Sequence, residues 1–265
     1  MTTYQRCGAI AVAFALSATL SAQAAVDPAT VVGMWLFDEG GGKTAIDASD
    51  NGLDGVVVGP AEWEKGQFGQ AIAFDGATVS VEITEDPSLA MPELTIAAWA
   101  NVVAATGVRW QSIMMRGQDP RNYLLVVDKD TQKLQLSITK GAPGAWGGPI
   151  AGEAISDEEW HHVAAVIGPE TGLAIYTDGV LIKADAYSEP SLDAAPAKTV
   201  IGDGSGGGHQ LEGLIDEVAL FNVELTEDEI VEIMTDGLEL ATGLTKAVQP
   251  SGKVATTWGR LRERR

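Results

Sequence analysis

Short apolar stretches separated by turn residues occupy most of the chain between Val31 and Ile215. Many read as strands, because they alternate or stay apolar for a few residues and end at Gly, Asp, Asn or Pro. The predicted strands span residues 32–37, 70–74, 79–83, 94–103, 112–116, 123–127, 134–139, 160–167, 173–177, 180–184, 198–201 and 213–221. No helical period lies between them. The pattern therefore excludes βαβ winding and predicts an all-β sandwich of two packed antiparallel sheets.

The clearest turn is Asp178-Gly179, which separates the predicted strands 173–177 and 180–184. Both residue types accept positive φ, as the tight turn of a two-residue β-hairpin requires. We therefore expect these two strands to pair directly with each other.

One short helix is predicted near the end of the chain. Thr226 and Glu229 have the spacing of a capping box, in which each side chain bonds the other's backbone N–H. Ile230, Ile233 and Met234 then recur on one helical face. We expect this helix to dock on the sandwich through that face.

The first residues read as a targeting segment. Arg6 provides a basic start, residues 9–20 are apolar, and Ala22-Gln23-Ala24 has small residues at the positions that a signal peptidase prefers. The apolar run is shorter than the roughly 20 residues of a membrane span. The sequence thus predicts a signal peptide over 1–24 and a secreted, periplasmic or cell-surface protein without a membrane span in its mature chain. An uncleaved N-terminal anchor is the alternative.

Removal of this segment leaves one domain and a tail. Residues 26–236 are long enough for a single large sandwich, and residues 237–265 read as a flexible tail that ends in a basic stretch up to Arg265. The tail could also dock on the acidic body or be read by export or anchoring machinery. Cys7 leaves with the signal, so the mature chain has no disulfide.

The net charge of the chain limits the classes of partner that it can bind. The formal net charge is −20, and loss of Arg6 makes it −21. Nucleic acids and anionic membranes are bound by clustered Lys and Arg, so both are excluded as partners. Divalent cations and neutral ligands are compatible with this surface, although the acidity could serve solubility alone.

Several blocks together resemble one family. In order they are residues 35–42 (WLFDEGGG), 47–55 (DASDNGLDG), 68–76 (FGQAIAFDG), 94–99 (LTIAAW), 159–164 (EWHHVA), 175–179 (IYTDG), 211–222 (LEGLIDEVALFN) and 225–230 (LTEDEI). They are similar to laminin-G-like domains of the concanavalin A-like lectin/glucanase superfamily. The resemblance implies a jelly roll whose first and last strands lie side by side. It also implies a domain that binds calcium, carbohydrate or protein. The glycine-rich segment 202–208 departs from the family pattern.

Calcium is the expected cofactor, in a structural role. It prefers carboxylate, amide and carbonyl oxygens on turns, and such residues lie at the ends of predicted strands. The candidate ligands are Asp38, Asp47, Asn51, Asp75 and Asp216. The resemblance associates Asp216 and the Asn51 turn with the calcium of the family. The alternative is that these residues only form turns, with side chains that bond the backbone.

Two tryptophans are candidates for ligand binding. Trp110 and Trp146 lie in polar connections, where an exposed ring could stack on a sugar. Trp35, Trp99 and Trp160 occupy strand positions and read as core residues. A loop tryptophan that covers the core is the alternative for the first two.

Catalytic signals are weak. Related glycoside hydrolases place two glutamates on one strand, whereas the acidic runs here, 157–159 and 227–229, lie at a turn and a helix start. His161 and His162 are adjacent on a strand, so they face opposite sides and cannot share a zinc ion. The sequence therefore predicts a non-catalytic binding module for a glycan or an extracellular protein. A structural or adhesive envelope component is the alternative, followed by a glycoside hydrolase.

Overall fold

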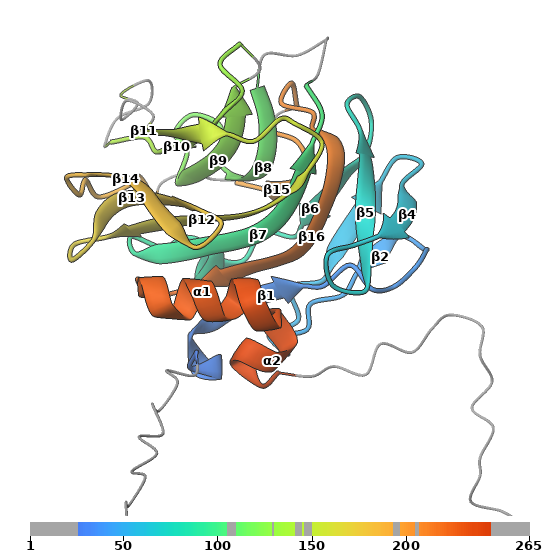
Figure 1. Cartoon of the computed structure of the whole chain (residues 1–265), viewed down its shortest axis with the longest axis horizontal. Helices are drawn as coiled ribbons and strands as arrows, with labels where there is room; N and C mark the ends of the chain where they lie inside the picture. The colour runs from blue at the N-terminus through green and yellow to red at the C-terminus, as the bar shows by residue number, and fades with distance from the viewer. Residues whose placement is uncertain are drawn as a thin grey trace, which may run out of the picture.

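The computed structural model describes residues 26–104, 110–128, 130–140, 145, 150–192, 197–204 and 207–244. They form two antiparallel sheets of eight strands each, packed as a sandwich (Figure 1). The predicted fold class is thereby confirmed. The predicted signal peptide lies outside the described residues, as does the tail beyond residue 244.

The strands divide evenly between the sheets. Sheet A has the order β14 (Val180–Asp185), β13 (Gly172–Thr177), β12 (Trp160–Gly168), β7 (Leu94–Val102), β16 (Glu212–Phe221), β5 (Gln70–Asp75) and β4 (Glu62–Lys65), with β1 (Val31–Trp35) paired to β16. Sheet B has the order β11 (Ile150–Ala154), β10 (Lys133–Ser137), β9 (Tyr123–Asp128), β8 (Trp110–Arg116), β15 (Thr199–Ile201), β6 (Ser80–Ile83), β3 (Gly55–Val58) and β2 (Thr44–Ala45). The helical segments are η1 (Pro28–Thr30), η2 (Pro87–Leu89), α1 (Glu227–Asp236) and α2 (Leu238–Thr242).

The strands that the sequence pattern missed are short or polar. They are β2, β3, β4 and β11. Strand β4 is mostly charged and lies at an edge of sheet A, with Glu62, Glu64 and Lys65 exposed. An exposed edge strand needs no apolar alternation, because neither of its faces has to be buried. Hydrophobic pattern alone therefore cannot find such a strand.

The chain ends of the domain meet in sheet A, as the resemblance implied. Strand β1 pairs antiparallel with β16, with Val31 opposite Phe221 and Trp35 opposite Val218. Figure 1 shows β1 beside the far end of β16, next to the helices. The opening and closing segments thus share one ladder of backbone hydrogen bonds.

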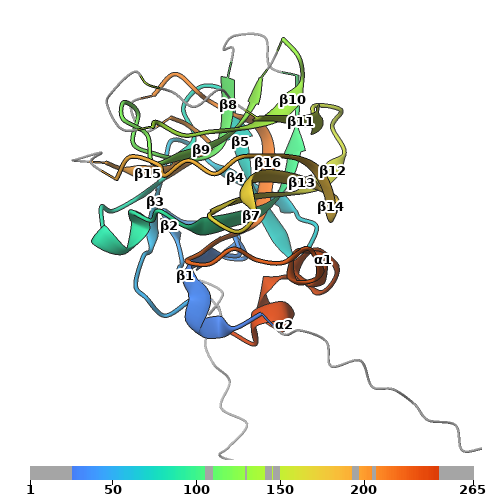
Figure 2. The same cartoon turned by 90° about the vertical axis from the view of Figure 1, so that its left-hand side faces the viewer.

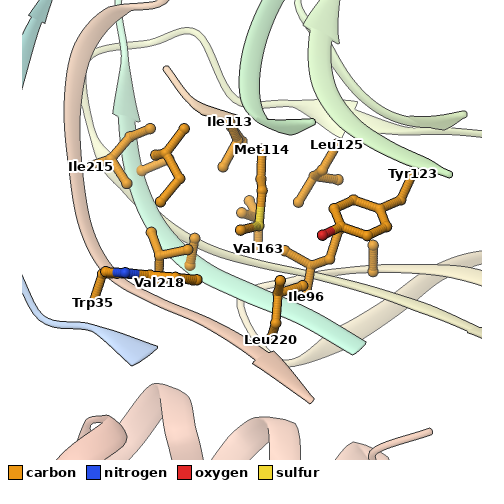
Figure 3. Close-up of a cluster of buried hydrophobic side chains, with 14 of the residues drawn as sticks. Trp35, Ile96, Ile113, Met114, Tyr123, Leu125, Val163, Ile215, Val218 and Leu220 are labelled. Atoms are coloured by element: carbon orange, nitrogen blue, oxygen red, sulfur yellow. The ribbon is translucent and has the colours of Figure 1, made fainter. Parts of the chain in front are cut away.

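The main core fills the space between the sheets. Figure 3 shows Ile113 and Met114 from sheet B reaching toward Ile96 and Val163 from sheet A. Trp35 is fully buried in this core, and its indole N–H donates to the Leu53 carbonyl at 2.9 Å. Burial of apolar side chains at about 25 cal/mol per Å² is the main stabilising contribution.

A second core lies under the helices. Ile230 and Ile233 of α1 pack on the outer face of sheet A, against residues that include Ala164 and Tyr176. Figure 2 shows α1 and α2 together on the side of sheet A that faces away from sheet B. The helices therefore cover one outer face of the sandwich. None of the described helices is long and apolar enough to cross a membrane.

Both local predictions are confirmed. Asp178 and Gly179 have φ of 51° and 76° in the turn between β13 and β14. Thr226 and Glu229 form the complete capping box at the start of α1. A second helix, α2, follows the predicted boundary at Asp236 and buries Leu238 and Ala241.

The capping box gives the first testable prediction. Thr226→Ala removes the side-chain acceptor for the Glu229 N–H, and we expect the free energy of unfolding to fall by about 1 kcal/mol. Chemical denaturation measures this. The control is Thr235→Ala, an exposed position within the same helix, where we expect a change below about 0.5 kcal/mol. Equal stability of the two variants would contradict the role of the cap.

Candidate functional site

Strand β16 changes partners at its middle. Glu212 to Ile215 pair with β5, and Val218 to Phe221 pair with β1. Between them the pairing with β7 is irregular, because the register shifts between Asp216 and Ala219. Asp216 and Glu217 thus lie at a seam where one neighbouring strand ends and the next begins.

Asp216 is completely buried at this seam. Its Oδ2 accepts the Phe68 N–H at 2.9 Å, and its Oδ1 has no hydrogen-bond partner among the described residues. Burial raises the pKa of Asp216 to about 8, and the charges of Glu217 and Asp38 act in the same direction. A buried carboxylate with an unused oxygen is costly unless a cation or a proton compensates it.

Glu217 is also buried, and it has a positive φ of 52°. This backbone conformation is uncommon outside glycine. Glu217 lies in the bulge of β16, where the side chains of both Asp216 and Glu217 point into the protein interior. The Glu217 Oε2 accepts the Leu238 N–H at 2.5 Å and so links the seam to α2. Burial raises the pKa of Glu217 to about 7, with Asp38 and Glu239 contributing.

Asp38 completes the carboxylate cluster, which we define as Asp38, Asp216 and Glu217. It follows β1, and its Oδ1 accepts the Gln70 N–H at 2.7 Å. Two glycines of the turn before β5 lie against this cluster. A Cβ on Gly66 would lie 2.4 Å from Asp216 Oδ2 and 2.7 Å from the Gln70 carbonyl oxygen, and one on Gly69 would lie 2.1 Å from Asp38 Oδ1. Only glycine fits at either position.

The other predicted calcium ligands do not join this cluster. The carboxylate of Asp47 accepts the N–H groups of Met34, Ser49 and Leu53. Asn51 donates from its side chain to the carbonyls of Val31 and Val32, at the opposite end of β1 from Asp38.

Asp75 is likewise engaged with its own turn. Its Oδ2 accepts the Thr78 hydroxyl, and its Oδ1 accepts the N–H groups of Ala77, Thr78 and Val79. Burial acts to raise the pKa of Asp75, but these bonds hold it below the ordinary range. The structure therefore does not bring the five predicted ligands together at one point. The side chains of Asp47, Asn51 and Asp75 bond backbone groups, as the turn interpretation expects.

A separate pocket of about 420 Å³ opens on the outer face of sheet B. Leu124 and Val126 alternate with the core residues Leu125 and Val127, so they face away from the main core. Together with Met115 they form a small apolar cluster, against which Trp110 packs. The residues that line the pocket are Trp110, Gln118, Asp119, Arg121, Leu124, Val126, Gln135, Ser137 and His209.

The polar groups of the pocket stand beside this apolar wall. Gln135 is 7% exposed, and its Oε1 has no hydrogen-bond partner among the described residues. Arg121 donates from Nη1 to Ser137 Oγ at 3.3 Å. Burial lowers the pKa of His209, and the Arg121 charge acts in the same direction, so this imidazole is neutral at pH 7. The pocket therefore offers both donors and acceptors next to apolar surface.

Of the two predicted ligand-binding tryptophans, Trp110 lies at this pocket and is partly exposed. Trp146 lies outside the described residues. Sequence reasoning did not single out Gln135, Ser137 or His209. A signal for the first two was present, because they alternate with Leu134 and Leu136 in a predicted strand and so face away from the core.

The histidine pair on β12 separates as the alternation of a strand requires. His162 is buried against Trp99, with ring centroids 5.4 Å apart. His161 is partly exposed and contacts Asp178 at 2.9 Å and Asp157 at 3.2 Å. Within the described ranges, no group of three or more His, Cys, Asp or Glu side chains is arranged as a ready metal site. An ion at the carboxylate cluster would therefore need backbone oxygens as well.

Comparisons with known proteins agree with the fold. The concanavalin A-like lectin/glucanases superfamily matches residues 75–231. No curated protein matches the chain. Among solved structures, the binding domain of Paraclostridial Mosquitocidal Protein 1 superposes with a TM-score of 0.62 at 13% identity, covering 79% of this chain and 52% of that one.

Two further structures are similar. Domain 4 of AbnA, a GH43 extracellular arabinanase from Geobacillus stearothermophilus solved in complex with arabinotriose, has a TM-score of 0.59 at 16% identity, covering 78% of this chain and 98% of that one. The binding domain of botulinum neurotoxin DC, in complex with rat synaptotagmin II, gives 0.62 at 12% identity, covering 80% and 53%. The chain spans about half the length of the toxin binding domains that it matches. These likenesses show the fold alone.

The carboxylate cluster predicts a pH dependence in protein stripped of divalent cations. The pKa values of Asp216 and Glu217 are raised above their ordinary 3.8 and 4.5, so the folded state binds the extra protons. The stability that the neutral acids provide is present below about pH 4 and is lost as the pH rises to about 8. Asp216→Asn should therefore raise the free energy of unfolding at pH 8 by on the order of 2 kcal/mol, and by less at pH 5.

Chemical denaturation in the presence of a chelator measures this difference. The matched control is Asp75→Asn, which should lower stability at both pH values, because that carboxylate is hydrogen-bonded in its charged form. An Asp216→Asn effect that is equal at the two pH values, or destabilising at pH 8, would contradict the account of the cluster.

Proposed function

Because the chain belongs to the concanavalin A-like lectin/glucanase superfamily, we propose that it is an exported, non-catalytic module that binds a carbohydrate in the pocket of Trp110. The observation that carries this proposal is the buried, unpartnered Oε1 of Gln135 beside the apolar wall of that pocket. Two of these similar structures are binding domains of toxins, and the third is a domain solved in complex with arabinotriose.

The chemistry of the pocket suits a sugar ring. A pyranose or furanose has an apolar face, which packs on an aromatic ring, and hydroxyl groups around its edge. Trp110, Leu124 and Val126 provide the apolar surface, and a ligand hydroxyl would donate to Gln135 Oε1. A volume of about 420 Å³ is within the usual range of small-ligand pockets.

Hydrolysis is less well supported than binding. Double-displacement or inverting hydrolysis requires a pair of carboxyl groups across the scissile bond. Among the described residues that line the pocket, Asp119 is the one carboxylate. A protein partner is the second candidate, because a toxin binding domain of the same fold was solved with synaptotagmin II. A concave pocket with a buried acceptor favours the glycan over a flat protein surface.

The proposal also includes export from the cell. The basic, apolar and small-residue pattern of residues 1–24 is that of a signal peptide. The AbnA domain comes from an extracellular enzyme.

The proposal also includes a structural calcium ion, bound at the carboxylate cluster. Asp216 Oδ1 is a buried, unused carboxylate oxygen, and the missing side chain of Gly66 lets the backbone carbonyl of Gln70 lie near Asp216 Oδ2. These hard oxygens fit calcium, with Asp38 and Glu217 as further carboxylates. When bound, the ion would supply positive charge at the seam and hold β16, the Gly66–Gln70 turn and the segment after β1 together.

The pocket predicts the effect of two substitutions on glycan binding. A glycan array that includes arabino-oligosaccharides identifies the best ligand, and isothermal titration calorimetry then measures its affinity. Gln135→Leu should weaken binding at least about tenfold, because it removes the buried acceptor. Trp110→Ala should weaken it by a similar factor through loss of the stacking surface.

The matched control is Trp63→Ala, a half-buried tryptophan on β4 of the other sheet. It should leave the affinity unchanged, whatever it does to stability. The proposal fails if the array gives no signal with calcium present, or if the two pocket variants bind as tightly as the unmodified protein.

The calcium site predicts a ligand-dependent melting temperature. Saturating calcium should raise Tm by several degrees through mass action, because the unfolded chain lacks the site. Asp216→Asn should abolish this rise, whereas Asp75→Asn should lower the starting Tm and leave the rise intact. Differential scanning calorimetry with calcium and with chelator measures both. The same Tm in the two conditions would rule out the calcium site without affecting the glycan pocket.

A further inference from the structure

A row of polar side chains faces the interior of the sandwich where β9, β8 and β15 lie side by side. Arg116 on β8 is directly opposite Tyr123 on β9 and Thr199 on β15. Residues opposite each other in a ladder share a face, with Cβ atoms about 5 Å apart. Tyr123 belongs to the main core, and its ring reaches between the sheets in Figure 3. Arg116 and Thr199 therefore point to the same interior.

The burial of this row is nearly complete. Arg116 is 3% exposed, and Tyr123 and Thr199 are fully buried. Asn122, next to Tyr123, exchanges hydrogen bonds of 3.1 and 2.9 Å with the main chain of Met91. These bonds hold the segment around Leu89 and Met91, which are themselves buried, at this end of β9. The row is thus shielded from large ligands.

The guanidinium of Arg116 has unused donors. Arg116 Nε and Nη1, the Tyr123 hydroxyl and the Thr199 hydroxyl are buried without a hydrogen-bond partner among the described residues. The ion pairs of the described chain do not include Arg116. Burial raises the pKa of Tyr123, while Thr199 and the Arg116 charge oppose that rise, which agrees with their proximity. A hydrogen bond between the Tyr123 and Thr199 hydroxyls would still leave the positive charge of the Arg116 guanidinium without a counter-charge.

The missing partner must be an acceptor and must carry negative charge. A guanidinium has only donors, and a buried charge without a counter-charge is strongly destabilising. A water molecule would accept hydrogen bonds but would leave the charge. A small anion compensates both the charge and the donors, and it needs little space.

We propose that Arg116, Tyr123 and Thr199 bind a small monovalent inorganic anion, such as chloride, inside the sandwich. The site lies on the inner face of sheet B, where β9, β8 and β15 are neighbours, and it is separate from the Trp110 pocket and the carboxylate cluster. The anion would tie β15 to β8 and β9 through side chains, in addition to the backbone ladder.

The test compares salts at constant ionic strength. The full chain is melted in sodium chloride, in sodium bromide and in sodium gluconate, whose anion is too large to enter, with calcium held constant. We expect Tm to be about 2 to 4 °C higher in chloride and bromide than in gluconate. Thr199→Val keeps the shape of the side chain and removes one donor, so it should reduce this difference by at least half. Thr235→Ala, on α1, should retain it fully.

A second readout locates the anion. Crystals grown in bromide should show an anomalous peak within hydrogen-bonding distance of Arg116 Nη1 and Thr199 Oγ1. Arg116→Met should remove both the peak and the salt difference; if this variant does not fold, Thr199→Val decides. The same Tm in all three salts, absence of the peak, or a full salt difference in Thr199→Val would each overturn the proposal.

Discussion

The exchange of partners along β16 is the constraint on which sheet A depends. On one side β16 pairs with β7 over most of its length, and on the other it pairs first with β5 and then with β1. The opening strand can join the sheet only where β5 has ended, so two residues of β16 remain without a strand on that side. The strand pairing and the bulge of β16 together direct the side chains of Asp216 and Glu217 into the interior, where both are buried. The turn before β5 closes the seam with Gly66, Gly69 and backbone N–H groups. A side chain at either glycine would clash with Asp216 or Asp38.

The two sheets differ in what covers their outer faces. The outer face of sheet A is covered by α1 and α2, which bury Ile233 and Leu238 against it. The outer face of sheet B carries Leu124 and Val126 at the floor of a pocket instead. The carboxylate cluster belongs to the covered sheet and the Trp110 pocket to the open one. In the proposed function, an ion at the cluster would act on the scaffold, while ligand specificity would depend on the side chains around Gln135.

Much of this architecture follows from local sequence, and the site does not. Strands such as β7 and β12 are long and apolar, and the Asp178-Gly179 turn and the Thr226 cap are local signals, so each was predicted correctly. Short or charged strands such as β4 were missed because their pairing depends on distant partners. The same reason explains the outcome for the predicted calcium ligands. Asp38 and Asp216 converge through the pairing of chain ends, which the family resemblance implied, whereas Asp47 and Asp75 bond their own turns. Sequence alone does not distinguish a carboxylate that caps a turn from one with an unused oxygen.

The central claim is that the open face of sheet B is the recognition surface of this domain. A crystal structure of the protein with calcium and the oligosaccharide that it binds most tightly tests this claim most directly. The account predicts a sugar ring on Trp110 with one hydroxyl donating to Gln135 Oε1. A sugar bound to a strand edge, to the helical face or to the hairpin of β13 and β14, with the pocket empty, would contradict it.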